Sequence, residues 1–191
     1  MPVHESIPDR TSKETRVGGA LCAATLPHSS ALRRNRVSLP QHIYHVTKRL
    51  APGVSHSLDL TDFGQILIDA FLYQRAHGSR LFAFVVMLDH IHWLFAIPES
   101  RSLATCVQVT FNWASTQINR DRHRKGRLWQ DGYYDHLLRD SETVTGLVRY
   151  IEENPVRKGL CDTAQSWAWS SACPGNHQHL DRDWLSFHRF E

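Results

Sequence analysis

The amino-acid sequence predicts an α+β domain in which strands and helices follow one another in the order β-α-β-β-α-β, with one further helix behind them. Two kinds of pattern support this prediction: short runs typical of strands, and longer segments whose apolar residues recur at helical spacing. The runs predicted as strands are 43–49, 81–88, 90–97 and 133–139. The order is that of a ferredoxin-like split unit, a sandwich of helices on a sheet.

Helix signals lie between these strands. Residues 59–62 offer aspartate N-caps ahead of an apolar stripe that begins at Phe63 and ends near His77. Ser102 is the predicted cap of a second, longer helix that runs to about Arg120. Both helices therefore fall where the β-α-β-β-α-β order requires them.

The appended helix, capped by Ser141, is predicted to carry a tyrosine on its flank. Its buried face consists of four apolar residues at i, i+3, i+4, i+7 spacing, which are Val144, Leu147, Val148 and Ile151. Tyr150 and Asn154 lie about 70–110° from the middle of that face and one turn apart. A helix packed at a sheet edge would thus present both to the sheet. Pro155 cannot continue the hydrogen-bond ladder, so we expect the helix to end at Asn154.

Composition sets the broad class. The chain has 191 residues, 41% of them apolar, and a formal net charge of +3, so an anionic partner has to be argued from local patches. We expect residues 1–37 to be a disordered basic tail, 38–175 the functional domain and 176–191 a C-terminal extension. No apolar run reaches the roughly 18–20 residues of a membrane span. Four scattered cysteines without a CxxC pair are typical of reduced thiols. We therefore expect a cytoplasmic protein with no membrane contact.

His90 and His92 are the most informative residues of the sequence. Successive side chains of a strand point to opposite faces, so the two imidazoles project from one face and Ile91 from the other. Two neutral imidazoles on a rigid sheet offer lone pairs from fixed directions and form half of a divalent-metal site. A His-apolar-His triplet alone is weak evidence in a chain with 13 His. Its weight comes from the coincidence with Tyr150 and Asn154.

Five stretches in a fixed order give the chain a family resemblance. They are Ile43–Arg49, Met87–Leu94, Gly126–His136, Tyr150–Leu160 and Trp169–Ser171. The triplet His90-Ile91-His92 followed by Tyr150 and Asn154 resembles the single-tyrosine HUH nucleases, where HUH means His-hydrophobic-His. Within that class the chain resembles the REP-associated tyrosine transposases, over roughly residues 40–172.

The resemblance implies a transposase that cleaves single-stranded DNA beside a hairpin. A Mg²⁺ or Mn²⁺ ion held by His90, His92 and the amide oxygen of Asn154 would polarise the scissile phosphate. Tyr150 would attack that phosphate, giving a 5′-phosphotyrosine and a free 3′-OH that can reverse the step. Many relatives have Gln in place of Asn154, and Leu88 stands where the family often has Pro.

Positive charge near these motifs predicts where DNA is held. Residues 120–127 include five Lys or Arg, enough to grip the phosphates of a hairpin or its flank, and Trp129 follows as a candidate for base stacking. Further basic pairs follow the first strand and the tyrosine helix. The residues predicted to contact DNA are Lys48, Arg49, Arg122, Arg124, Lys125, Arg127, Trp129, Arg157 and Lys158.

Two other functional classes stay open at the level of the sequence. A non-catalytic hairpin-binding protein would explain the fold and the basic run but not the four residues His90, His92, Tyr150 and Asn154. A metal-dependent hydrolytic nuclease would explain the metal site but has no need of Tyr150. The expected partner is single-stranded DNA with a hairpin, in the bacterial nucleoid, and the chain is expected to act as a monomer or a homodimer.

Overall fold

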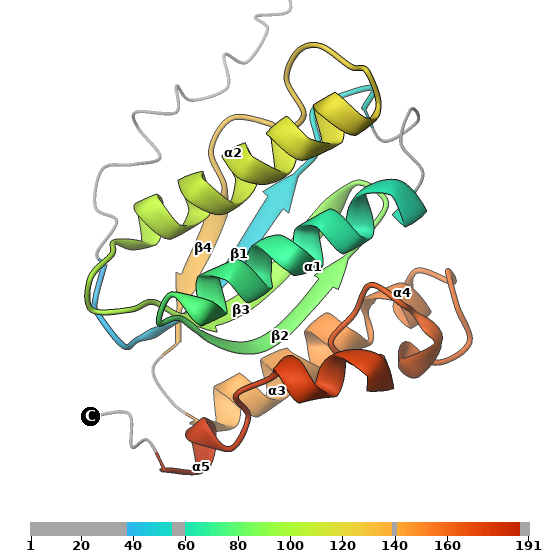
Figure 1. The fold of residues 1–191 in the computed structure, drawn as a ribbon. Coiled ribbons are helices and arrows are strands. Elements are labelled where there is room, and N and C mark those ends of the chain that lie inside the picture. The colour runs from blue at the N-terminus through green and yellow to red at the C-terminus, as the bar shows by residue number, and fades with distance from the viewer. Residues whose placement is uncertain (1–37, 55–59, 139–140, 188–191) are drawn as a thin grey trace, which may run out of the picture.

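The fold is a four-stranded antiparallel sheet with helices on both faces (Figure 1). The computed structural model describes residues 38–54, 60–138 and 141–187. The predicted tail, residues 1–37, lies outside the described residues. The strands are β1 (Ile43–Arg49), β2 (Arg80–Val86), β3 (His90–Ala96) and β4 (Tyr134–Leu137). They lie side by side in the order β2-β3-β1-β4, and all three pairs are antiparallel.

Three long helices complete the domain. They are α1 (Leu60–Ala76), α2 (Leu103–Asp121) and α3 (Ser141–Glu152). Shorter turns follow α3, of which α4 (Asn154–Arg157) and α5 (Trp184–Phe187) are α-helical. The predicted α+β class and the element order β-α-β-β-α-β are confirmed. Ser102 caps α2 as predicted, because its side-chain oxygen accepts from the Thr105 amide at 3.1 Å.

The expected end of the tyrosine helix is wrong by two residues. α3 ends at Glu152, and Asn154 begins α4 with Pro155 directly behind it. Proline fits there because an amide in the first turn of a helix has no intrahelical partner to lose. Asn154 therefore opens a new turn of helix at the end of α3.

The two faces of the sheet carry different side chains. On the α1/α2 face, Trp93 stacks on Phe95 with ring centroids 3.5 Å apart, and Phe71 of α1 stacks on Trp93 at 5.0 Å. The neighbouring positions of β3, His90, His92 and Leu94, point to the opposite face. There α3 packs its apolar side over one half of the sheet, mainly against β2. We call this second side the α3 face.

Residues 169–171 cover the outer edge of β2. The Val86 amide donates to the Trp169 carbonyl at 2.9 Å, and the Ser171 amide donates to the Phe84 carbonyl at 2.9 Å. These bonds continue the sheet by a short antiparallel bridge between Val85 and Ser170. The edge strand is thus closed against pairing with another chain.

The same C-terminal segment also fastens the end of α3. The Ser171 hydroxyl donates to the Glu152 carboxylate at 2.8 Å, and Arg182 pairs with the same oxygen. Asp181 accepts from the Leu81 amide at 2.9 Å and from Arg75 of α1. The described part of the predicted extension 176–191 thus packs on the domain.

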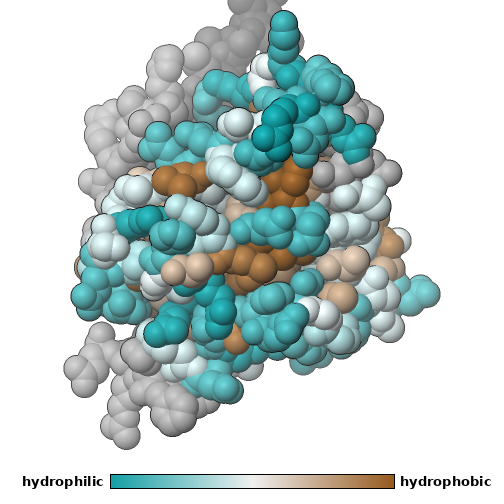
Figure 2. Space-filling model, in the orientation of Figure 1, coloured by the Kyte–Doolittle hydropathy of each residue, from teal (hydrophilic) through white to brown (hydrophobic). Residues whose placement is uncertain are grey.

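Hydrophilic side chains cover most of the side seen in Figure 2, and hydrophobic ones show only in narrow bands between them. Among the helices of the described residues, none combines the length and the apolar character that crossing a membrane requires.

We predict that Gly64→Ala lowers the free energy of unfolding by about 1–3 kcal/mol, because a methyl group there would overlap the Trp169 indole. The matched control is Gly146→Ala on α3, where a Cβ meets no atom within 4 Å. That variant should gain about 0.5–1 kcal/mol from helix propensity. Urea denaturation of both variants measures the difference, and equal stabilities would contradict the packing of Trp169 on α1.

Candidate active site

Two imidazole nitrogens converge on the α3 face. The Nε2 atoms of His90 and His92 lie 3.2 Å apart, with the rings nearly perpendicular. Both side chains are buried, at 8% and 6% exposure. Strand β3 places them there because positions i and i+2 of a strand share a face.

The outer nitrogens of the two rings are held by neighbours. The Nδ1 atom of His90 lies 2.6 Å from the Asp89 carboxylate, which accepts a hydrogen bond from the Nδ1–H group. The Nδ1 atom of His92 lies 3.0 Å from the Thr47 hydroxyl and 3.0 Å from Nε2 of His45. With a proton on each Nδ1, both Nε2 lone pairs face the same point.

This arrangement fits a divalent metal ion. Two nitrogens bound to one ion at about 2.0–2.1 Å stand roughly 3–3.4 Å apart, which agrees with the observed separation. Ligating histidines usually donate their other N–H to a carboxylate or a similar acceptor, as His90 does to Asp89. Within the described residues, no group of three His, Cys, Asp or Glu side chains gathers around a common point.

Burial favours the neutral form of His92 and His45. Burial is the main cause that lowers the pKa of His92 to about 3, and its neighbours His45 and His90 contribute to the same shift. Burial also lowers the pKa of His45 to about 4, with His136 as a second cause. For Asp89, burial alone would raise the pKa, but the bond to His90 and the charge of Arg49 bring it below its usual value. Neutral imidazoles are the form that binds metals.

Tyr150 of α3 reaches the edge of this centre. Its ring meets the His92 ring edge to face, with centroids 5.9 Å apart, and the side chain is 40% exposed. On its other side the Arg157 guanidinium of α4 lies 5.0 Å from the tyrosine ring centroid. The tyrosine is thus open to solvent and held between a buried imidazole and a cation.

Asn154 lies one turn beyond Tyr150 and is buried, at 6% exposure. Its amide nitrogen is 3.5 Å from the Tyr150 carbonyl oxygen. That contact directs the amide nitrogen back to α3. The structure thus brings His90, His92 and Tyr150 into contact and places Asn154 at the end of the tyrosine helix.

Most of the predicted DNA-contacting residues are on the surface. Arg49 is exposed beside the histidines and pairs with Asp89 at 3.3 Å. Arg157 and Lys158 are exposed on and after α4. The basic run forms the turn after α2, where His123 has a positive φ of 48°. In that turn Arg124 donates to Asn119 at 3.2 Å, and Arg127 pairs with Asp131, while Arg122 caps α2 and Lys125 is exposed.

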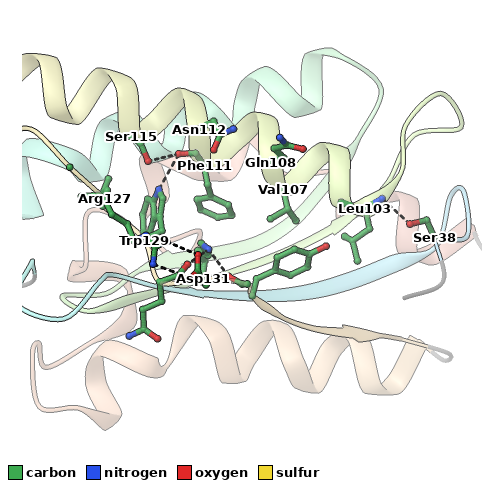
Figure 3. A pocket seen from close by; sticks show the side chains of 17 residues that line it. Ser38, Leu103, Val107, Gln108, Phe111, Asn112, Ser115, Arg127, Trp129 and Asp131 are labelled. Carbon is green, nitrogen blue, oxygen red and sulfur yellow. Dashed lines mark hydrogen bonds and ion pairs between the residues drawn. The ribbon is translucent and has the colours of Figure 1, made fainter. Parts of the chain in front are cut away.

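Lys48 and Trp129 make contacts inside the protein. The buried Lys48 ammonium donates to the carbonyl oxygens of Gln130, at 2.6 Å, and of Gly132. The Trp129 ring packs on Phe111, and its N–H donates to the Phe111 carbonyl at 3.0 Å (Figure 3). Both side chains line a cavity of about 590 Å³ between α2 and residues 126–133, on the α1/α2 face. They fasten this segment to the domain, and their contact with DNA stays a prediction.

His45 and Thr47, which hold His92, are not among the residues predicted from the sequence. Both belong to the motif Ile43–Arg49, but their role depends on pairing between strands far apart in the chain. In the register, Thr47 stands opposite His92, and His45 is two positions back on the same face. A period of two in β1 was visible in the sequence, whereas its alignment with β3 was not.

Comparison with known proteins identifies the family. The family model described as "Transposase IS200 like" matches residues 39–154, more than half of the chain. The matched residues include His90, His92, Tyr150 and Asn154. The chain belongs to the IS200-like transposase family.

Distant relatives have more specific names. The chain is 28% identical over 99 residues to a REP-associated tyrosine transposase of Haemophilus influenzae, covering 47% of this chain and 56% of that protein. It is 25% identical over 115 residues to the REP-associated tyrosine transposase of Escherichia coli K12, covering 59% of this chain and 66% of that one. The matches thus span between half and two thirds of each relative.

A solved structure shares the fold. It is a REP-associated tyrosine transposase bound to a REP hairpin, with a TM-score of 0.58 and 22% sequence identity. The match covers 71% of this chain and 79% of that one.

We predict that His45→Phe weakens Mn²⁺ binding by about 10–100-fold, because the variant removes one acceptor that orients His92 while keeping a ring in the space. Titration of the protein with Mn²⁺, followed by electron paramagnetic resonance, measures the affinity without any DNA. The control is His77→Phe, an exposed histidine after α1. An unchanged affinity in His45→Phe, with thermal stability retained, would show that Thr47 alone orients His92.

Proposed function

We propose that this protein is a DNA transposase in which Tyr150 attacks a phosphodiester of single-stranded DNA beside a hairpin. The observation that carries the proposal is the meeting of an exposed tyrosine with two converging imidazoles, the ring of His92 being 5.9 Å from that of Tyr150. A nucleophile and a cation-binding pair are the two parts that metal-assisted phosphoryl transfer needs.

His90, His92 and the side-chain oxygen of Asn154 would hold Mg²⁺ or Mn²⁺. When bound, the ion withdraws charge from the scissile phosphate and makes its phosphorus easier to attack. Tyr150 near the end of α3 and Asn154 at the start of α4 are four residues apart, so the proposed nucleophile and metal ligand are positioned by two consecutive helices. Asp89 and His45 keep the two rings turned so that their Nε2 atoms converge.

The chemical step exchanges one phosphate ester for another. The Tyr150 oxygen forms a bond to phosphorus while the bond from phosphorus to the 3′ oxygen breaks, and that oxygen takes up a proton. The product is a 5′-phosphotyrosine and a free 3′-OH, and the reverse attack by such a hydroxyl rejoins a strand. The tyrosine oxygen gives up its proton as attack proceeds. The Arg157 guanidinium beside the ring favours the negative charge that develops on the oxygen.

Single-stranded DNA beside a hairpin is proposed as the substrate on two grounds. A similar structure, by its description, is bound to a REP hairpin. In this chain, cationic side chains lie on the surface beside the site, where Arg49, Arg157 and Lys158 can contact phosphates. The turn with Arg122, Arg124 and Lys125 offers a second basic surface at the end of α2.

We predict that Tyr150→Phe abolishes DNA cleavage and the covalent adduct while DNA binding stays within about twofold, because only the attacking oxygen is lost. The substrate is a REP-type hairpin with a single-stranded flank, labelled at either end, and adducts are detected after denaturation. Protein that travels with the 3′-labelled fragment indicates a 5′-phosphotyrosine. His92→Ala and excess EDTA are expected to stop the same reaction.

Each alternative function gives a different result in this assay. Cleaved DNA without an adduct would indicate a hydrolytic nuclease, and bound but uncut DNA would indicate a binding protein. Protein on the 5′-labelled fragment would mean a 3′-phosphotyrosine and a different class of enzyme. Full cleavage by Tyr150→Phe would remove Tyr150 from the proposed role.

We also predict that replacing Arg122, Arg124 and Lys125 with Ala weakens hairpin binding and flattens its dependence on salt. Each lost phosphate contact should reduce the log–log slope by roughly 0.7–0.9. Fluorescence anisotropy at several salt concentrations measures the slope. Arg101→Ala, at the opposite end of α2, is the control, and an unchanged slope in the triple variant would mean that the turn is only solvated.

A further inference from the structure

Half of the α3 face is left open beside the candidate active site. α3 covers the part of the sheet formed by β2, whereas β4 at the far side carries exposed residues. Tyr134 of β4 is 66% exposed, the largest fraction among the exposed large hydrophobic side chains of the described residues. A tyrosine that is folded into a strand and yet points into water is a candidate for contact with a partner.

The strand register places Tyr134 in line with His92. Tyr134 pairs with Thr47 across β4 and β1, and Thr47 pairs with His92 across β1 and β3. Directly paired residues of a sheet point to the same face. Two strand spacings amount to about 10 Å, so the tyrosine lies about that far from the proposed metal ligand.

Packing on β4 agrees with this orientation. Tyr133 and Leu137 join the core on the α1/α2 face, so the residues that alternate with them, Tyr134 and His136, point to the α3 face. His136 is also exposed and stands opposite His45 in the register. The open half of the face thus presents two rings in water next to a row of buried histidines.

We propose that Tyr134 is a stacking platform for an unpaired base of the DNA strand that enters the active site, with His136 beside it. This inference rests on the proposed function and adds to it the path of the single strand across β4 and β1. Aromatic side chains on an open sheet bind single strands because every base has a flat π-face to stack on, whatever its identity. Arg49 is an exposed cation on the same face, beside His90, and is placed to contact the phosphates between base and metal.

Two other exposed aromatic residues lie on the opposite side of the sheet. Tyr73 and Trp113 are 49% and 43% exposed, but they belong to α1 and α2 on the opposite side of the sheet. They lie in a shallow apolar hollow that is away from the histidines. Tyr73 is therefore a matched control for the removal of an exposed tyrosine.

The test compares two DNA probes with the full chain in EDTA, so that no cleavage occurs. One probe is a REP-type hairpin with a single-stranded flank that contains 2-aminopurine, and the other is the same hairpin without the flank. Tyr134→Ala should weaken binding of the flanked probe by about 5–100-fold and should remove the quenching of 2-aminopurine that stacking causes. Binding of the unflanked hairpin should stay within about twofold. Tyr134→Phe, which keeps the ring, and Tyr73→Ala should behave as the wild type.

The outcomes separate this inference from the proposed reaction. Equal affinities of Tyr134→Ala and wild type for the flanked probe would overturn the platform, as would an equal loss with both probes. A wild type that gains no affinity from the flank would overturn it too. If the wild type forms no covalent adduct with DNA but shows a flank effect that depends on Tyr134, the transposase chemistry is rejected and the stacking platform is retained.

Discussion

The pairing of β1 with β3 is the constraint on which both the core and the candidate site depend. Its register sets Thr47 against His92 on one face and Val46 against Trp93 on the other. Because side chains alternate, a shift by one residue would turn the histidines into the aromatic core and Trp93 into water. The large apolar residues that pack under α1 and α2 therefore fix the position of the His90 and His92 pair. Packing of the aromatic core on one face thus sets the positions of the histidines on the other.

Within this frame the sequence predicted what depends on local periodicity. Alternation in β3 was enough to place His90 and His92 on one face, and helical spacing was enough to put Tyr150 on the flank of α3. It did not predict which basic or aromatic residues become buried, because that depends on packing between distant segments. Lys48 and Trp129 are of the residue types that DNA-binding surfaces contain, and only the folded structure shows that both side chains are buried. The hydrogen bond between His92 and His45 was not predicted, because it depends on the strand register, which is also non-local.

The position of the tyrosine depends on two further attachments. The apolar side of α3 packs on β2, which sets the height of Tyr150 above the sheet. Glu152, at the end of the same helix, is bound by Ser171 and Arg182 from the C-terminal segment. Between these anchors the chain turns at Glu153 into α4, which carries Asn154 and Arg157 to either side of the tyrosine. A nucleophile held at both ends loses little conformational entropy on reaching a substrate.

The C-terminal bridge to β2 also bears on how this chain can be divided. The segment matched by the family ends at Asn154, but backbone groups of Phe84 and Val86 are bonded by Trp167, Trp169 and Ser171. In a fragment that ends at Asn154, the outer edge of β2 would be open. This strand is rich in apolar residues and lies in the longest hydrophobic run of the fragment. Such an edge is a template for pairing with other copies, and the fragment would be prone to aggregate. We therefore expect the smallest stable fragment to be longer than the segment that the family model matches.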